Sequence, residues 1–115
     1  MNALKNKVQL IGRMGAKPEF KILEGDKRVA KFSLATNEIY RNSKGEKVEE
    51  TTWHQLIAWG KTADIIHQYT DKGSEIAIEG KLINRSYTGK EGVKKFVTEI
   101  QVNEVLFLGD KITAV

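Results

Sequence analysis

Alternation of apolar and polar residues runs through most of the chain and predicts β-strands. The alternating runs are residues 7–10, 29–36, 51–59, 76–87 and 93–108. The first run leads to Gly12 and Gly15, where a strand can bend, and Pro18 then falls in a connecting segment. Polar turns at residues 41–47 and 88–92 join the second run to the third and the fourth to the fifth. The pattern therefore predicts five strands, the last two in a long hairpin.

The period changes between residues 61 and 71. Apolar residues recur there at close to helical spacing, at Ala63, Ile65, Ile66 and Tyr69. Thr62 can cap the start of a helix, and Gly73 follows where a helix can end in the left-handed region. The sequence therefore predicts one short helix of about ten residues.

The order of elements is strand, strand, strand, helix, strand, strand. Five mainly antiparallel strands with this helix position are typical of the OB-fold, a partly open Greek-key barrel. We predict an all-β, five-stranded OB-fold Greek-key barrel with one short helix between strands 3 and 4 and a long hairpin of strands 4 and 5. A sandwich without a helix is the main alternative. The predicted domain is residues 1–110, and residues 111–115 are the expected start of a C-terminal tail.

Two tryptophans, Trp53 and Trp59, lie six residues apart in the run 51–59. Residues an even number apart share one face of a strand, so both indoles point to the same side. Gln55 lies between them on that side, whereas Leu56 and Ala58 point the other way. A polar Gln between two indoles is unusual for a buried face. We expect the two small aliphatic side chains to fill the barrel and the indoles to face outward.

Two more aromatic residues, Tyr40 and Tyr87, stand beside polar turns. A cation lies within two residues of each of three of these rings: Arg41, Lys61 and Arg85. Bases stack on exposed aromatic rings while the backbone of a single strand follows a positive groove. The OB-fold binds oligonucleotides on strands 2–3 and on the loops joining strands 1–2 and 4–5, where all four rings fall. The set therefore predicts a site for single-stranded nucleic acid.

The composition of the chain narrows the classes of protein to which it can belong. The net charge is +4, a mild preference for polyanions, and the basic residues concentrate in residues 1–31. The chain has no cysteine, which excludes disulfides and thiol catalysis and fits a reducing cytoplasm. The longest apolar runs have only a few residues, so we expect neither a membrane span nor a signal peptide. A cytoplasmic protein is expected.

Six segments together resemble the bacterial single-stranded DNA-binding protein family. They are NKVQLIGRMG (6–15), KPEF (17–20), FSLATNE (32–38), TTWHQLIAWGK (51–61), KGSEIAIEGKL (72–82) and TEIQVNEVLFLG (98–109). The resemblance covers nearly the whole chain in order. It implies an OB-fold, a homotetramer, a nucleoid-associated location, and sequence-independent binding and protection of single-stranded DNA in DNA replication, recombination and repair.

The resemblance also implies roles for individual residues. The stacking positions correspond to Tyr40, Trp53, Trp59 and Tyr87, and basic positions of the DNA path to Arg41, Lys61, Lys72 and Arg85. His54 corresponds to a subunit-interface position. Ser86 stands where members commonly carry Lys. Members usually continue into a flexible tail with an acidic, Phe-terminated tip that recruits replication and repair proteins, whereas this sequence stops at Val115.

Three alternatives remain open at the level of the sequence. An RNA-binding OB-fold of the cold-shock kind would contact the 2′-OH. A protein-interaction domain would use the aromatic rings as a hot spot. A metal-dependent nuclease of five-stranded barrel type would need clustered carboxylates, whereas the adjacent Glu49 and Glu50 point to opposite faces. We predict no catalytic residue, no metal ligand and no cofactor, and a surface position for His67.

Overall fold

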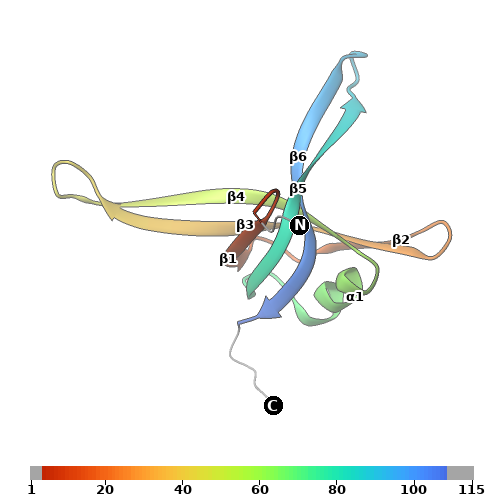
Figure 1. Ribbon diagram of the computed structural model, residues 1–115, viewed down its shortest axis with the longest axis horizontal. Helices are drawn as coiled ribbons and strands as arrows, with labels where there is room; N and C mark the ends of the chain where they lie inside the picture. Colours follow the sequence, from red (N-terminus) through yellow and green to blue (C-terminus); the bar gives the residue numbers. More distant parts are fainter. Residues whose placement is uncertain (1–3, 109–115) are drawn as a thin grey trace.

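A computed structural model of the chain describes residues 4–108 (Figure 1). Its elements in chain order are β1 (Val8–Met14), β2 (Glu19–Leu23), β3 (Lys27–Arg41), β4 (Lys47–Trp59), α1 (Gly60–Tyr69), β5 (Glu75–Thr88) and β6 (Lys94–Phe107). The predicted boundary at residue 110 and the predicted tail segment 111–115 lie outside the described residues. Within residues 4–108, no helix has both the length and the apolar character to cross a membrane.

Five of the strands close into a barrel. Their order is β1-β5-β6-β4-β3, and β1 pairs a second time with β3, which completes the ring. The pairing of β4 with β6 at Leu56 and Ile100 is parallel, and the other pairings are antiparallel. The all-β, five-stranded OB-fold barrel with one short helix is therefore confirmed.

The core consists of the inward-facing residues of the alternating runs. Its buried members include Ala30, Phe32, Leu34, Leu56, Ala58, Ile76, Ile78, Ile100 and Val102. The helix adds Ala63 and Ile66, both fully buried. Burying one Leu or Ile side chain stabilises the fold by about 1.5–3 kcal/mol relative to leaving it exposed. The predicted inward direction of Leu56 and Ala58 is correct.

The strand β2 is absent from the predicted elements. It pairs with the first part of β3 through a tight turn in which Gly25 and Asp26 have φ of 79° and 62°. Its side chains are mostly exposed, so the sequence carries only a weak alternating signal there. Because β2 pairs with β3 alone, it lies outside the closed ring and forms an arm with it.

The helix differs from the predicted one at both ends. Its N-cap residue is Trp59, with no side-chain cap, so the prediction of Thr62 as the cap is wrong. Gly60 has a φ of 61°, which turns the chain from β4 directly into the helix and leaves Thr62 in the first turn. The helix ends at Thr70, which is in extended conformation, and not at Gly73 as predicted. Gly73, with a φ of 88°, lies in the turn that follows.

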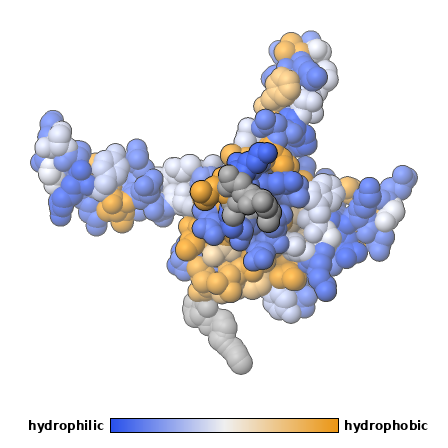
Figure 2. Space-filling model, viewed as in Figure 1, coloured by the Kyte–Doolittle hydropathy of each residue, from blue (hydrophilic) through white to orange (hydrophobic). Residues whose placement is uncertain are grey.

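Three hairpins project from the barrel as arms (Figure 1). The β3–β4 pairing continues without a break from Val29 opposite Trp59 to Arg41 opposite Lys47, well beyond the predicted runs. The β2–β3 and β5–β6 hairpins form the other two arms, and polar residues predominate at the ends of all three (Figure 2). A polar arm has little core to bury, which makes its outer side chains available to a ligand.

Candidate nucleic-acid interface

The outer face of β3 and β4 carries both tryptophans, as the alternation predicts. Cross-strand pairs on this face are Ala35–Trp53, Ser33–Gln55, Lys31–Ile57 and Val29–Trp59. The indoles of Trp53 and Trp59 are exposed by 57% and 43%. Val29 and Ile57 are buried on the same face, so they form an apolar floor beneath more exposed neighbours.

Trp53 is held in place by the end of β1. A Cβ atom added to Gly15 would lie 2.6 Å from Cζ3 and 2.9 Å from Cη2 of the Trp53 indole. The same atom would lie 3.2 Å from Oγ of Ser33. One edge of the indole therefore packs against the glycine backbone, while more than half of the side chain stays open to solvent. A ring fixed in this way loses little rotational freedom when a flat ligand stacks on it.

Two adjoining hollows follow this face between the indoles. The first has a volume of about 300 Å³ and is lined by Ala16, Lys17, Glu19, Lys31, Phe32, Ser33 and Gln55. The second has a volume of about 250 Å³ and is lined by Glu19, Lys21, Leu23, Val29, Lys31, Ile57, Trp59 and Arg85. Since Glu19 and Lys31 belong to both, the two hollows form one channel, called here the basic groove.

Sequence reasoning missed three lysines of the basic groove: Lys17, Lys21 and Lys31. The signal for Lys31 was available, because it alternates with the core residues Ala30 and Phe32 and so faces outward. Lys21 reaches the groove only through the pairing of β2 with β3, which no local pattern revealed, and Lys17 lies in the segment just before β2.

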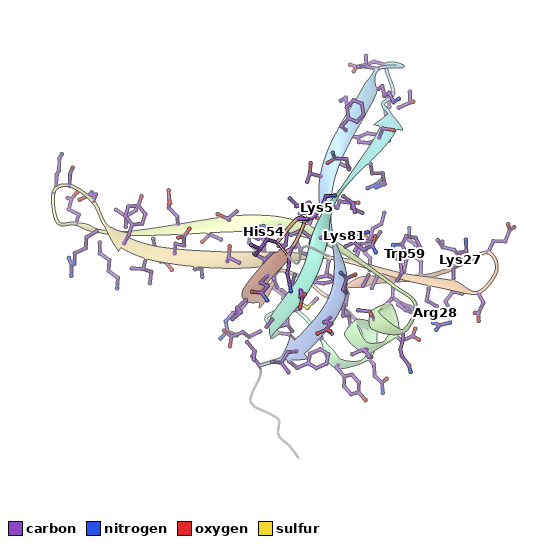
Figure 3. The ribbon with its side chains drawn as sticks, in the orientation of Figure 1. Lys5, Lys27, Arg28, His54, Trp59 and Lys81 are labelled. Carbon is purple, nitrogen blue, oxygen red and sulfur yellow. The ribbon has the colours of Figure 1, made fainter. Side chains whose placement is uncertain are left out.

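A further cation lies on the other side of Trp59. Lys27 lines a hollow with Trp59 and Gly60, and Figure 3 places it beside Trp59 on the β2–β3 arm. The charge of its neighbour Arg28 already has a partner, because Nε of Arg28 donates to Oδ1 of Asp64 at 2.6 Å. That contact raises the pKa of the guanidinium. Arg28 therefore ties the arm to α1, whereas Lys27 remains at the surface.

Arg85 lies on the basic groove but its charge has a partner. Its Nε and Nη2 donate to the two carboxylate oxygens of Glu99 at 3.1 and 3.0 Å. Glu99 is only 7% exposed, and the hydrogen bonds from Arg85 hold the pKa of its carboxyl below the ordinary value. The guanidinium pKa is raised by the same contact.

The two tyrosines lie on separate arms. Tyr87 is 48% exposed and shares the face of β5 that carries Arg85, with Lys95, a cation the sequence reasoning missed, directly opposite on β6. Tyr40 is 45% exposed near the end of the β3–β4 arm, and the register puts it on the opposite face of that ribbon from Trp53. The structure thus brings Trp59 and Arg85 together but leaves both tyrosines away from the groove.

The remaining predicted cations are all exposed. Arg41 donates from Nη1 to the carbonyl of Gly45 at 2.9 Å, within the turn of its own arm. Lys61 lies in the first turn of α1, directly after the β4 end that carries Trp59. Lys72 lies in the turn before β5.

Backbone hydrogen bonds fix the turn that carries Lys72 beside the end of β1. The amide of Gly73 donates to the carbonyl of Met14 at 2.8 Å, and the amide of Met14 donates to the carbonyl of Ser74 at 2.9 Å. Met14 immediately precedes Gly15, the residue on which Trp53 packs. Lys72 is therefore anchored near the Trp53 end of the basic groove.

The two histidines lie elsewhere. His54 is half-buried on the face opposite Trp53, with its Nε2 3.0 Å from Oγ1 of Thr36, and its interface role stays a prediction. His67 is exposed, as expected, and its ring stacks on Phe20 with centroids 4.1 Å apart. Across residues 4–108, no three or more His, Asp or Glu side chains cluster closely enough to hold a metal ion.

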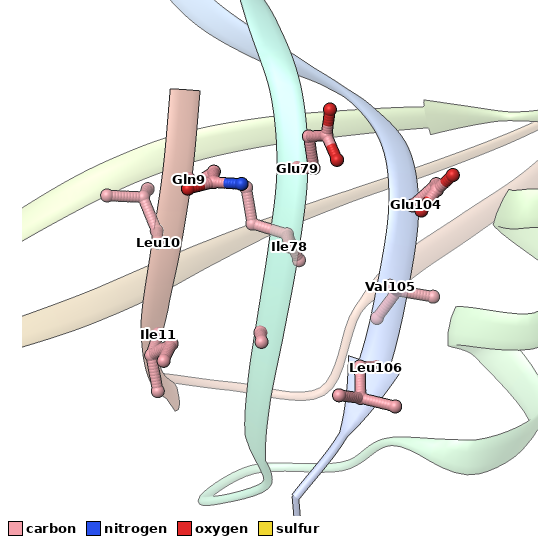
Figure 4. A pocket seen from close by; sticks show the side chains of 9 residues that line it. Gln9, Leu10, Ile11, Ile78, Glu79, Glu104, Val105 and Leu106 are labelled. Atoms are coloured by element: carbon pink, nitrogen blue, oxygen red, sulfur yellow. The ribbon is translucent and has the colours of Figure 1, made fainter. Parts of the chain in front are cut away.

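A larger hollow, of about 760 Å³, lies on the opposite side of the molecule over β1, β5 and β6 (Figure 4). The register gives it one apolar row, Ile11–Ala77–Leu106, and one polar row, Gln9–Glu79–Glu104. Ile11 and Leu106 are 61% and 62% exposed. Neither an aromatic residue nor a cation lines this hollow. Of its two carboxylates, Glu79 is paired with Lys7 at 2.8 Å, and Glu104 adds a negative charge that repels phosphates. We therefore place the nucleic-acid interface on the basic groove.

Comparison with known proteins identifies the family of the chain. The sequence profile of the Single-strand binding protein family matches residues 5–108. A single-stranded DNA-binding protein 1 of Chlorobaculum tepidum is 45% identical over 107 residues, which cover 92% of this chain and 66% of that protein. A single-stranded DNA-binding protein of Neisseria meningitidis is 39% identical over 106 residues, covering 92% and 61%. The chain thus spans less than two thirds of the length of these relatives.

A solved structure shows the same fold. A Plasmodium falciparum SSB in complex with ssDNA superposes with a TM-score of 0.81 at 36% sequence identity. The match covers 95% of this chain and 100% of that chain. The likeness therefore extends over the barrel and its arms.

The Arg85–Glu99 pair makes a pH-dependent contribution to stability. Unfolding returns the Glu99 carboxyl to its ordinary pKa of 4.5, while folding lowers it. The contribution is therefore complete above pH 4.5 and is lost as the pH falls through the lower folded-state pKa. We expect Glu99→Gln to melt below the unmodified chain at pH 7 and the gap in Tm to narrow as the pH drops below 4.5. A gap that stays constant with pH would contradict this.

Proposed function

The chain belongs to the Single-strand binding protein family, and we propose that it binds single-stranded DNA without sequence preference and protects it during replication, recombination and repair. The observation that carries this proposal is the pair of half-exposed indoles on the face that the lysine-lined groove follows. Trp59 lines the groove, and Trp53 lies two positions beyond its lining residue Gln55 on the same face of β4. Aromatic platforms beside a positive groove bind single strands through any base, because every base has a flat face.

The proposed path of the strand follows the outer face of β3 and β4. Bases stack on Trp53 and Trp59, which lie about 20 Å apart along β4 at roughly 3.3 Å per residue. Phosphates between them face Lys17, Lys21 and Lys31. Each stacked base contributes about 1–3 kcal/mol, and each neutralised phosphate releases counterions.

Further contacts extend the path beyond the groove. Tyr40 and Tyr87 provide rings on two arms. Arg41, Lys61 and Lys72 add cations outside the groove, and Arg85, within it, completes the set of predicted DNA contacts. The length and polar surface of the arms suit a strand that winds around the barrel (Figure 2). Duplex DNA binds poorly in this scheme, because paired and stacked bases do not offer their faces.

DNA is preferred over RNA as the ligand because of the named relatives and not because of the rings. Stacking alone does not distinguish the two, whereas a contact to the 2′-OH would. Competition between poly-dT and poly-U strands of equal length separates the two candidates. We place the protein's action in the bacterial cytoplasm, on the nucleoid, and expect replication and repair proteins as partners wherever the full protein carries an acidic C-terminal tail.

We also propose that the chain forms a homotetramer. Support comes from the exposed apolar row Ile11–Ala77–Leu106, which an isolated barrel would leave open to water (Figure 4). The proposal includes His54 as a residue of a subunit contact, as the family resemblance implies. Light scattering should give four times the 13.0 kDa of one chain. A mass of one chain at micromolar concentration would refute the tetramer without touching the proposal on DNA.

Removal of one platform tests the DNA proposal. Trp53→Ala should weaken binding to a dT strand by about 1–3 kcal/mol and leave the melting temperature nearly unchanged, because the indole is half-exposed. Anisotropy of a labelled strand measures the affinity, and circular dichroism the stability. Tyr69→Ala is the matched control, since Tyr69 is 62% exposed on α1, away from the basic groove. Unfolding with unchanged affinity would show that Trp53 is a core residue instead.

Lys61→Ala tests whether Lys61 contacts a phosphate of the bound strand. Loss of one phosphate contact lowers the slope of log affinity against log salt by about 0.7 on a single strand. Titrations with a dT strand at several salt concentrations measure this slope. Lys7→Ala serves as the control, because Lys7 pairs with Glu79 at 2.8 Å on the face away from the groove. An unchanged slope in Lys61→Ala would remove this residue from the path.

A further inference from the structure

Arg85 differs from the other cations of the basic groove in the state of its charge. Its bidentate contact with Glu99 brings a positive and a negative charge together at 3.0–3.1 Å. Lys21 and Lys31 line the same hollow, and neither has an ion pair within 4 Å among residues 4–108. The pair has no net charge, so its attraction for a phosphate is much weaker than that of a free lysine.

The geometry leaves Arg85 other ways to bind. Glu99 uses one edge of the guanidinium, through Nε and Nη2, which leaves Nη1 and the flat faces of the group. The Arg85 side chain is 47% exposed, and it lines the hollow of about 250 Å³ that also holds the Trp59 indole. Guanidinium planes stack on bases, and their free N–H groups donate to base oxygens.

The hollow itself suits a base better than a phosphate. Its floor consists of the buried side chains of Val29 and Ile57, and the indole of Trp59 adds a flat apolar wall. An apolar surface with a few polar groups at its rim is typical of a pocket for a planar ligand. A phosphate on this floor would lose its hydration against Val29 and Ile57. The exposed lysines of the same hollow, Lys21 and Lys31, can instead pair with phosphates that stay outside it, while a base occupies the floor.

We propose that Glu99 is a positioning residue, which holds Arg85 in the hollow so that the guanidinium contacts the base stacked on Trp59 and not a phosphate. This inference rests on the proposed function and refines it. A buried carboxylate is costly, and an aliphatic side chain would fill its place without that cost. The Glu99 carboxylate fixes the position of the Arg85 guanidinium and neutralises its charge, which an aliphatic side chain would not do.

Two strands of equal length distinguish a base contact from a phosphate contact. One is oligo-dT, and the other is an abasic oligonucleotide that keeps the phosphates and lacks the bases. Arg85→Gln alone would leave Glu99 buried and unpaired, so the test uses the double variant Arg85→Gln/Glu99→Gln, which removes both charges together. Lys31→Gln is the matched control from the same hollow.

The double variant should lose roughly tenfold in affinity for oligo-dT, within the range of one stacking contact, and little for the abasic strand. Its salt slope on oligo-dT should be unchanged. Lys31→Gln should lose affinity for both strands and lower the slope by about 0.7. If the double variant instead loses equally on both strands, Arg85 is a phosphate contact and the inference is overturned.

Glu99→Gln alone tests the positioning role. With Glu99 neutral, Arg85 becomes a free cation, and Lys31, whose charge also acts on Glu99, loses that attraction. Affinity for the abasic strand should therefore rise, and the salt slope should steepen by up to about 0.7. The ratio of affinities for oligo-dT and the abasic strand should therefore fall. The same comparison in the Lys31→Gln background isolates the share of Arg85. A merely structural role for Glu99 would lower both affinities by one factor and leave the ratio unchanged, which would overturn the inference.

The outcome for the unmodified chain keeps the two levels of the proposal apart. If the unmodified chain binds oligo-dT but a variant gives one of the overturning results above, only the roles proposed for Arg85 and Glu99 are refuted. No binding of oligo-dT by the unmodified chain at low salt removes the proposed function itself. Melting curves of every variant confirm that the comparison is made between folded proteins.

Discussion

Closure of the barrel by β1 is the constraint on which the rest of the molecule depends. The strand pairs with β5 along one edge and, at Arg13 and Met14, with β3 on the other. At this crossing a Cβ atom on Gly12 would collide with the carbonyl oxygen of Ala35, so only glycine allows the two backbones to approach. Because of this closure, the residues that follow in the chain, up to Gly15, lie against the Trp53 indole.

The same closure divides the surface into two chemically different sides. Lysines and indoles gather on the outer face of β3 and β4, where β2 adds further lysines. The opposite side, over β1 and β5, carries an apolar row and the carboxylates of Glu79 and Glu104. The lysines make the first side the more attractive one for a polyanion, and the apolar row is the surface that we propose for contact between subunits. The modest net charge of +4 conceals this separation.

Much of the fold and part of the candidate site could be predicted from the sequence. The barrel and its helix follow from local periodicity, since each half-buried strand must alternate and the helix must not. The exposure of Trp53 and Trp59 follows from the same alternation. The strand β2 could not be predicted, because its side chains stay exposed and its partner strand alone defines it.

The sequence by itself determined the five barrel strands and the helix, their order and the outward direction of the indoles, because these depend on residues a few positions apart. Only the tertiary structure decided what those indoles face. Lys21 reaches the groove through the β2–β3 pairing, and Arg85 meets Glu99 across fourteen residues through the β5–β6 pairing. Pairing between strands brings such residues together by register, which local sequence does not encode. Whether a given cation is free or already paired is therefore a property of the folded sheet.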